Sequence, residues 1–345
     1  MNYILSQYHK YPLCKFDDII KQAYQAEFGL GHILGENARD YLFAETAEVT
    51  AEAGDLYDVI SSRFARVHLA EYVRRGYSLN ALYYLMKIAE PLGGTQGGME
   101  ERLNKLQAMV DERLLDFSPD AVHLQIAAYK HKGCPPIHHS SGYKVNYRPH
   151  YRLVCANHAR YLPVIAKVYE LLEKQNVVFV AVDGFCGSGK TYLAKLLSEL
   201  WDAEIIHADD FFLPPAMRTE ARLSEVGGNI HYERLAETLK QAEVHRPFDY
   251  FRYDCRLGSF VTKHFTPKRL VIVEGTYVLR EDLARHCDVK VQLVVSKLTQ
   301  ASRLIAREGS AGYEVFKNRW IPLENRYFDL LPEEDERIVI DTTEF

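Results

Sequence analysis

The chain has 345 residues, 47% of them hydrophobic, which is more than one hydrophobic core usually holds, so we expect two domains. A net charge of −5 and a pI near 6.3 lack the basic excess of proteins that bind nucleic acid over a broad surface. The sequence has neither a signal-peptide pattern nor an apolar run near the roughly 18 residues of a membrane helix, so we expect a cytoplasmic protein without a membrane partner.

The first half of the chain has helical patterning. The glycine-rich segment at 28–35, which contains His32, is typical of a helix end, and so is the Gly93-Gly94 pair. Ser118 followed by Pro119 is typical of a helix start, since proline is tolerated in the first turn. We therefore predict a mainly α-helical N-terminal domain of unassigned function over residues 1–172.

A stretch dense in histidine, tyrosine and arginine occupies residues 131–154, and we interpret it as a binding loop. The spacing of its histidines and its cysteine fits no standard zinc template. An anion or phosphate site built from Lys144, Arg148 and Arg152 with tyrosine hydroxyls is the better functional interpretation. The alternative is that the stretch simply packs against the second domain.

From about residue 175 the pattern changes to short apolar runs that alternate with helix-length segments. Such alternation indicates right-handed βαβ crossovers and a parallel sheet covered by helices on both faces. We therefore predict an α/β domain over residues 173–345, of the P-loop NTPase fold class. Its strands are expected at 177–182, 205–206, 270–273, 289–295 and 337–340, and its first helix is expected to bury Leu193, Leu196, Leu197 and Leu200.

The segment GFCGSGKT at 184–191 matches the pattern G-x-x-x-x-G-K-[ST] and lies between a predicted strand and an amphipathic helix. Its glycines let backbone N–H groups surround phosphates, its lysine contacts the β- and γ-phosphates, and its threonine hydroxyl serves Mg²⁺. The alternative, a chance glycine-rich turn, does not explain the strand and helix on either side. The sequence thus predicts that ATP or a similar nucleoside triphosphate binds with Mg²⁺ at Gly184, Gly187, Ser188, Gly189, Lys190 and Thr191.

Acidic residues follow two of the predicted strands. Asp209 and Asp210, in HADDFFLPP, follow the second strand and fall at the carboxyl edge of the sheet, where ligands of open α/β folds bind. One of them is a candidate for accepting the proton of a substrate hydroxyl; otherwise the pair caps a turn. Glu274, in VEGTY, ends another strand and is a candidate ligand of Mg²⁺, the alternative being a solvated carboxylate.

These segments together resemble the uridine kinase and phosphoribulokinase-like branch of P-loop kinases. The resemblance covers about residues 177–345 and rests on the P-loop, ADDFF, GGNIHYERL, FRYDC, IVEGTY and RLIARE, in that order. It implies that Asp209 is the general base, that Glu274 belongs to the metal site, and that the segment 303–308 is a lid whose arginines, Arg303 and Arg307, act in catalysis with Lys190. The alternative for both arginines is an exposed helix surface.

The resemblance also places the acceptor pocket. Tyr253 and Asp254 in FRYDC, together with Asp210, are its candidate substrate-binding residues, and His231 and Tyr232 fall in the same region. Packing is at least as good an explanation for the aromatic residues among them.

Two functions are compatible with the sequence. In the first, the chain is an ATP- and Mg²⁺-dependent kinase whose partners are a nucleoside triphosphate and a small acceptor with a hydroxyl group, nucleoside-like or another metabolite. In the second, nucleotide hydrolysis is a switch that regulates partner binding by the helical module. A base plus a lid that excludes water favours the kinase. The sequence leaves the oligomeric state open, a homo-oligomer included.

Overall fold

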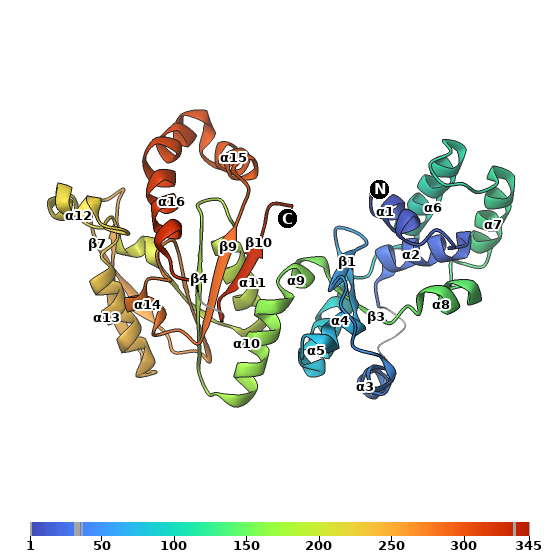
Figure 1. Cartoon of the computed structure of the whole chain (residues 1–345), viewed down its shortest axis with the longest axis horizontal. Helices are drawn as coiled ribbons and strands as arrows, with labels where there is room; N and C mark the ends of the chain where they lie inside the picture. The colour runs from blue at the N-terminus through green and yellow to red at the C-terminus, as the bar shows by residue number, and fades with distance from the viewer. Residues whose placement is uncertain (1, 31–34, 36, 334–335, 345) are drawn as a thin grey trace. The chain divides into compact units, whose positions relative to one another are not determined.

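A computed structural model describes residues 2–30, 35, 37–333 and 336–344 (Figure 1). The chain divides into two compact units, Met1–Leu162 and Pro163–Phe345. The boundary predicted at residues 172–173 falls inside helix α10 (Leu162–Lys174), which continues unbroken through that position. Within the described part of the chain, every helix is too short or too polar to cross a membrane.

The N-terminal unit is mainly helical, as the sequence predicts, but it also contains a small antiparallel sheet that the sequence analysis missed. The sheet has the order β1-β2-β3 and consists of β1 (Tyr57–Val59), β2 (Phe64–His68) and β3 (Tyr151–Cys155). Its helices are α1 (Asn2–Lys10), α2 (Phe16–Phe28), α3 (Ala38–Glu48), α4 (Leu69–Arg74), α5 (Leu79–Ala89), α6 (Gln96–Asp111), α7 (Pro119–His131), α8 (Ser141–Tyr147) and α9 (Ala156–Arg160), with a 3-10 turn at Glu90–Leu92.

Two predicted helix ends are confirmed. Helix α7 begins at Pro119, with Ser118 extended before it. Helix α2 ends at Phe28, where Gly29 has a φ of 61° and a Cβ atom would come within 2.4 Å of the Phe64 ring. His32 lies outside the described residues.

The histidine-rich stretch 131–154 is not a single loop, as we had interpreted it. It contains α8 and most of β3, which pairs with β2 so that Tyr151 lies opposite His68 and Val154 opposite Ala65. Long-range pairing with β2 forms this strand, and nothing within the stretch itself signals a partner so far away in the sequence.

The C-terminal unit contains a five-stranded parallel sheet with the order β10-β9-β4-β8-β5, and all its predicted strands are confirmed. A separate two-stranded hairpin follows α13. The strands are β4 (Val178–Gly184), β5 (Glu204–His207), β6 (Phe248–Asp254), β7 (Ser259–Phe265), β8 (Leu270–Glu274), β9 (Val289–Val294) and β10 (Ile338–Asp341).

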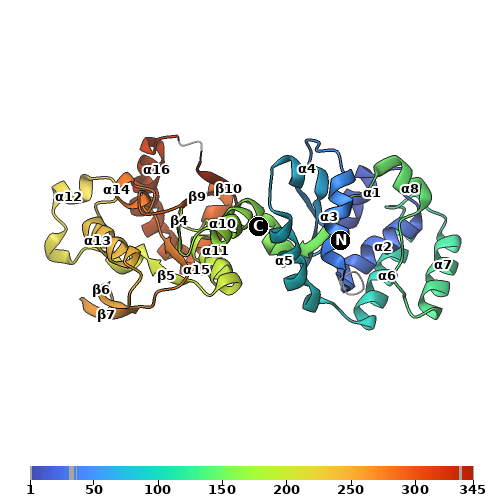
Figure 2. The same cartoon turned by 90° about the horizontal axis from the view of Figure 1, so that it is seen from below.

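Helices cover both faces of this sheet, with α13 and α14 on one side of β4 and α11 on the other (Figures 1 and 2). Alternating side chains of β4 explain the two layers: Phe179 and Ala181 pack with Leu235 and Leu239 of α13, and the residues between them face the opposite side. Besides α10, the helices are α11 (Lys190–Trp201), α12 (Glu220–Ser224), α13 (Tyr232–Glu243), α14 (Glu281–Ala284), α15 (Lys297–Val315) and α16 (Ile321–Leu330), with 3-10 turns at Ala208–Phe211 and Pro215–Met217 and a π-helical turn at Phe316–Trp320.

A fully buried carboxylate, Asp183, lies at the end of β4 and joins three segments of this unit. It accepts hydrogen bonds from the backbone N–H of Gly184 at 2.7 Å, the backbone N–H of Leu279 at 2.9 Å and the hydroxyl of Tyr327 at 2.7 Å. Burial raises the pKa of Asp183 from 3.8 to about 6, although these hydrogen bonds oppose the shift. The carboxylate therefore fixes where the chain leaves the sheet and enters the glycine-rich loop.

We expect Asp183→Asn to lower the free energy of unfolding by about 1–3 kcal/mol, because an amide NH₂ would face N–H and O–H donors. Tyr327→Phe removes a single donor and should lower it by about 1 kcal/mol. Urea denaturation followed by circular dichroism measures both.

The fold favours protonated Asp183, so its contribution to stability should fall as the pH rises from 3.8 towards about 6, and Asp183→Asn should lack this dependence. Equal stability of the wild type and Asp183→Asn would contradict this role.

Candidate active site

The glycine-rich loop connects β4 to α11, as predicted, and has a backbone that glycine permits. Gly184, Gly187 and Gly189 have φ angles of 153°, 75° and 97°. A Cβ atom on Gly184 would lie 2.4 Å from the backbone oxygen of Leu293 in β9. The loop thus packs closely on the sheet, and its N–H groups and the first turn of α11 form a cradle for an anion.

Lys190 is the first residue of α11 and folds back over the loop. Its ammonium donates to the backbone oxygen of Gly184 at 2.7 Å and to that of Phe185 at 3.1 Å. An ammonium carries three N–H donors, so one remains for a phosphate oxygen. The lysine therefore lies where the pattern G-x-x-x-x-G-K-[ST] requires a positive charge.

Oxygen donors suited to Mg²⁺ meet beside the loop. The hydroxyl of Thr191 lies 3.3 Å from both carboxylate oxygens of Glu274, which is buried at the end of β8. His207, at the end of β5, contacts the same carboxylate through Nδ1 at 2.6 Å, and this bond raises the pKa of the His207 imidazole. Hard oxygen ligands from Thr191 and Glu274, completed by phosphates, fit Mg²⁺ in an NTP site.

The two adjacent aspartates differ sharply in environment. Asp210 is buried and paired with the hairpin, at 2.9 Å from the ammonium of Lys263 and 3.9 Å from the guanidinium of Arg252. Asp209 instead is exposed towards the cavity described below. Desolvation by the surrounding residues raises its pKa, and the positive charge of Lys190 opposes this shift. Of the two aspartates, Asp209 is therefore the one that lines the cavity.

One cavity of about 630 Å³ gathers most of the predicted site. Side chains from the loop, from the ends of β5 and β8, and from α15 all line it. The predicted residues among them are Gly187, Gly189, Lys190, Thr191, Asp209, Glu274, Arg303 and Arg307.

The two predicted lid arginines have different surroundings. Arg303 donates to the backbone oxygen of Gly187 at 3.1 Å and to that of Thr342 at 2.6 Å, so it braces the loop. Arg307 pairs with the adjacent Glu308 at 2.7 Å, and its guanidinium lies 5.5 Å from the centre of the Phe316 ring. Helix α15 breaks just beyond, at Gly309, where φ is 73° and ψ is 171°. Arg307 thus lies next to a break in the helix, where a lid needs a hinge.

Several cavity residues were missed by the sequence analysis. Phe212 and Trp320 form an aromatic wall with ring centroids 6.3 Å apart. The buried carboxylate of Glu324 accepts the backbone N–H of Cys186 at 2.9 Å and so supports the loop from α16. Phe212 belongs to the ADDFF segment, which was a usable signal, whereas Trp320 and Glu324 lie in no recognised pattern.

The predicted acceptor residues Tyr253 and Asp254 do not line this cavity. Tyr253 is buried in the hairpin against Phe260, with ring centroids 5.4 Å apart. Asp254 accepts the backbone N–H groups of the hairpin turn and pairs with Arg252 at 2.7 Å. Together with Asp210, which pairs with Lys263 of β7, these side chains hold the hairpin in shape.

Two known proteins are similar in sequence to part of this chain. No protein-family model matches the chain. A uridine kinase of Haemophilus ducreyi is 28% identical over 143 residues, which are 36% of this chain and 64% of that protein. An inorganic pyrophosphatase of Arabidopsis thaliana is 30% identical over 142 residues, 37% of this chain and 20% of that protein. Each relative is thus matched over less than two thirds of its own length.

The C-terminal half of the chain is a distant relative of the uridine kinase-like P-loop kinases. Solved structures also resemble this P-loop kinase unit. One, from Bacillus stearothermophilus, is described as a possible uridine kinase; it is 17% identical, covers 52% of this chain and 97% of its own, and has a TM-score of 0.41. A circularly permuted protein of Saccharomyces cerevisiae is 14% identical, covers 51% and 97%, and has a TM-score of 0.42.

We expect Lys190→Ala to weaken ATP binding about a hundredfold, because a charge-assisted phosphate contact is lost. Isothermal titration calorimetry with a non-hydrolysable ATP analogue and Mg²⁺ measures the change. Lys195→Ala is the matched control, since Lys195 is exposed on the same helix and lies 3.9 Å from Glu199 alone. Binding that is equally tight in both variants would remove the P-loop assignment.

Proposed function

We propose that the C-terminal unit is an ATP-dependent, magnesium-requiring kinase that phosphorylates a hydroxyl group of a small molecule. One observation carries the proposal: Asp209 opens to the same cavity as Lys190 and Glu274. A carboxylate at that position has a role in transferring a phosphoryl group to an organic hydroxyl, and it is unnecessary for nucleotide binding alone.

The shape of the cavity supports a small organic acceptor. Its phosphate end is polar, with Lys190 and Thr191, whereas Phe212, Tyr277 and Trp320 line another part with aromatic rings. A volume of about 630 Å³ is in the range of small-molecule sites. Aromatic walls exclude water and favour a ligand with a ring or carbon skeleton, nucleoside-like or another metabolite.

The residues divide the catalytic work. Asp209 takes the proton of the acceptor hydroxyl, and its raised pKa makes it a stronger base than an ordinary aspartate. Lys190 and Arg307 supply positive charge for the oxygens of the transferred group, and Arg303 keeps the loop in position. Thr191 and Glu274 would hold Mg²⁺, which would supply positive charge that neutralises the phosphates.

We expect Asp209→Asn to preserve ATP affinity and to lower phosphoryl transfer by about a hundredfold or more, because the general base is lost. Asp249→Asn is the matched control, since Asp249 is exposed on β6, pairs with His264 at 2.7 Å, does not line the cavity and should leave turnover within a few-fold of the wild type. Steady-state kinetics and nucleotide titration separate the two effects. Normal turnover of Asp209→Asn would assign the base to another residue.

The acceptor is found by measuring ATP consumption with Mg²⁺, alone and with nucleosides, sugars, glycerate or pantothenate. We expect one compound to yield a phosphorylated product, with little ATP loss in its absence, because a closed site excludes water. Steady hydrolysis that no small hydroxyl compound increases, and that a macromolecule stimulates, would overturn the kinase in favour of the nucleotide-driven switch.

A further inference from the structure

The N-terminal unit contains a buried arginine that has no acidic partner. Arg66, in β2, is 2% exposed. Its Nη1 donates to the side-chain oxygen of Gln7 at 3.1 Å, and its Nε and Nη2 donate to that of Gln25 at 3.1 and 2.7 Å. Among the described residues no carboxylate lies within ion-pair distance, and three hydrogen bonds use three of the five N–H donors of a guanidinium. The ring of Tyr151 also lies 4.8 Å from the guanidinium carbon. Two N–H donors and a positive charge without a carboxylate partner therefore remain.

Other cations lie near Arg66, and the acids closest to it in the fold are already paired. Burial, Arg66 and Lys144 lower the pKa of the Lys21 ammonium to about 8. Asp18 is bound to His139 at 3.0 Å and to the hydroxyl of Ser140 at 2.7 Å. Asp58, which lies opposite Arg66 in the sheet, is bound to Lys10 at 2.9 Å and to His68 at 2.7 Å. A buried charge without a counter-charge destabilises the fold, so binding of a negatively charged ligand next to Arg66 would stabilise it.

A cavity of about 410 Å³ reaches Arg66. A second arginine, Arg148, also lines it, from the end of α8, where the backbone has a φ of 41°. The rest of the wall is rich in tyrosine: Tyr11, Tyr143 and Tyr147 lie with ring centroids 4.9 to 5.3 Å apart. Two acids, Glu48 and Glu52, line the cavity as well. Two cations, two acids and an aromatic wall in a space of this size suit a small metabolite.

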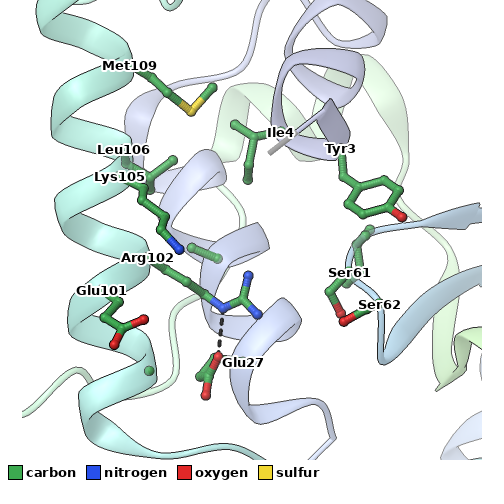
Figure 3. A pocket seen from close by; sticks show the side chains of 13 residues that line it. Tyr3, Ile4, Glu27, Ser61, Ser62, Glu101, Arg102, Lys105, Leu106 and Met109 are labelled. Carbon is green, nitrogen blue, oxygen red and sulfur yellow. Dashed lines mark hydrogen bonds and ion pairs between the residues drawn. The ribbon is translucent and has the colours of Figure 1, made fainter.

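The larger cavity of the same unit, of about 550 Å³, differs in how its buried charge is paired (Figure 3). Its buried acid Glu27 accepts from Arg102 at 2.7 Å and lies 3.0 Å from Arg63. Lys105 and Glu101 also line it, both exposed on α6. The buried charge of this cavity is thus neutralised within the protein, whereas Arg66 has no carboxylate at ion-pair distance among the described residues.

We propose that the N-terminal unit has a second ligand site, a cavity centred on Arg66 that binds a small metabolite through an oxyanion, either a phosphoryl or a carboxylate group. Arg66 binds the oxyanion with its two remaining N–H groups, and Arg148 supplies a second positive charge. Glu48 and Glu52 also line the cavity and accept hydroxyl or ammonium groups at the other end of the ligand. The site is separate from the P-loop and does not depend on the proposed kinase activity.

This site corrects the anion site expected from the sequence. Of Lys144, Arg148 and Arg152, only Arg148 lines the cavity. Arg152 is paired with Glu45. The central cation, Arg66, comes from a strand that is distant in the sequence.

Calorimetry tests the proposal on the full chain carrying Lys190→Ala, which weakens phosphate binding at the P-loop, with inorganic phosphate and acetate as separate probes. We expect one probe or both to bind, and Arg66→Gln added to Lys190→Ala to weaken that binding by about tenfold or more. Binding of phosphate alone assigns a phosphoryl ligand, and binding of acetate alone a carboxylate. No binding of either, or equal binding without Arg66, would overturn the site.

A second pair of variants avoids dependence on a buried substitution. Arg148→Gln changes an exposed side chain of the cavity and should weaken binding by about threefold or more. Lys144→Gln is the matched control: it removes an exposed charge on the same helix that does not line the cavity, and it should change binding by less than about twofold. If Arg66→Gln does not fold by circular dichroism, this pair decides, and equal effects of the two variants would reject the site.

Discussion

The buried carboxylate of Asp183 is the interaction on which the nucleotide site depends. It lies where β4 ends and the glycine-rich loop begins, and its oxygens also bind the chain at Leu279 and the hydroxyl of Tyr327. The loop is therefore anchored to the sheet at its first residue. Glu324 of α16 adds a second anchor through the N–H of Cys186. A loop held at these points keeps its N–H groups oriented before a nucleotide arrives, so binding need not fix them.

Strand register explains how residues distant in sequence form one site. In the parallel sheet, Glu274 lies opposite Val182 of β4 and opposite His207 of β5. All three strands end at the same edge, so the loop after β4, the carboxylate of β8 and Asp209 after β5 meet there. The site is thus a consequence of strand order β4-β8-β5, and any shift of register would separate Thr191 from Glu274.

Local patterns in the sequence predict the P-loop, the parallel strands and the helix ends at Gly29 and Pro119, because short segments with periodic apolar residues determine them. They do not separate Asp209 from Asp210, since only the folded hairpin brings Lys263 to Asp210. For the same reason the β1-β2-β3 sheet and the role of Arg66 were missed: both depend on pairing between β2 and a strand more than 80 residues away.

Two buried charged side chains, Asp210 and Arg66, differ in whether an oppositely charged side chain neutralises them. The negative charge of Asp210 is neutralised by Lys263. Asp209 directly precedes Asp210 in the same short helical turn, so the ion pair of Asp210 also fixes the direction in which Asp209 faces the cavity. Arg66 differs: of the fully buried charged residues that the structure describes, it is the one lysine or arginine, and its partners are neutral, namely the amides of Gln7 and Gln25 and the ring of Tyr151. Amide oxygens hold a guanidinium in place without neutralising it. The ion pair of Asp210 thus orients Asp209, whereas the contacts of Arg66 leave a positive charge that a ligand can neutralise.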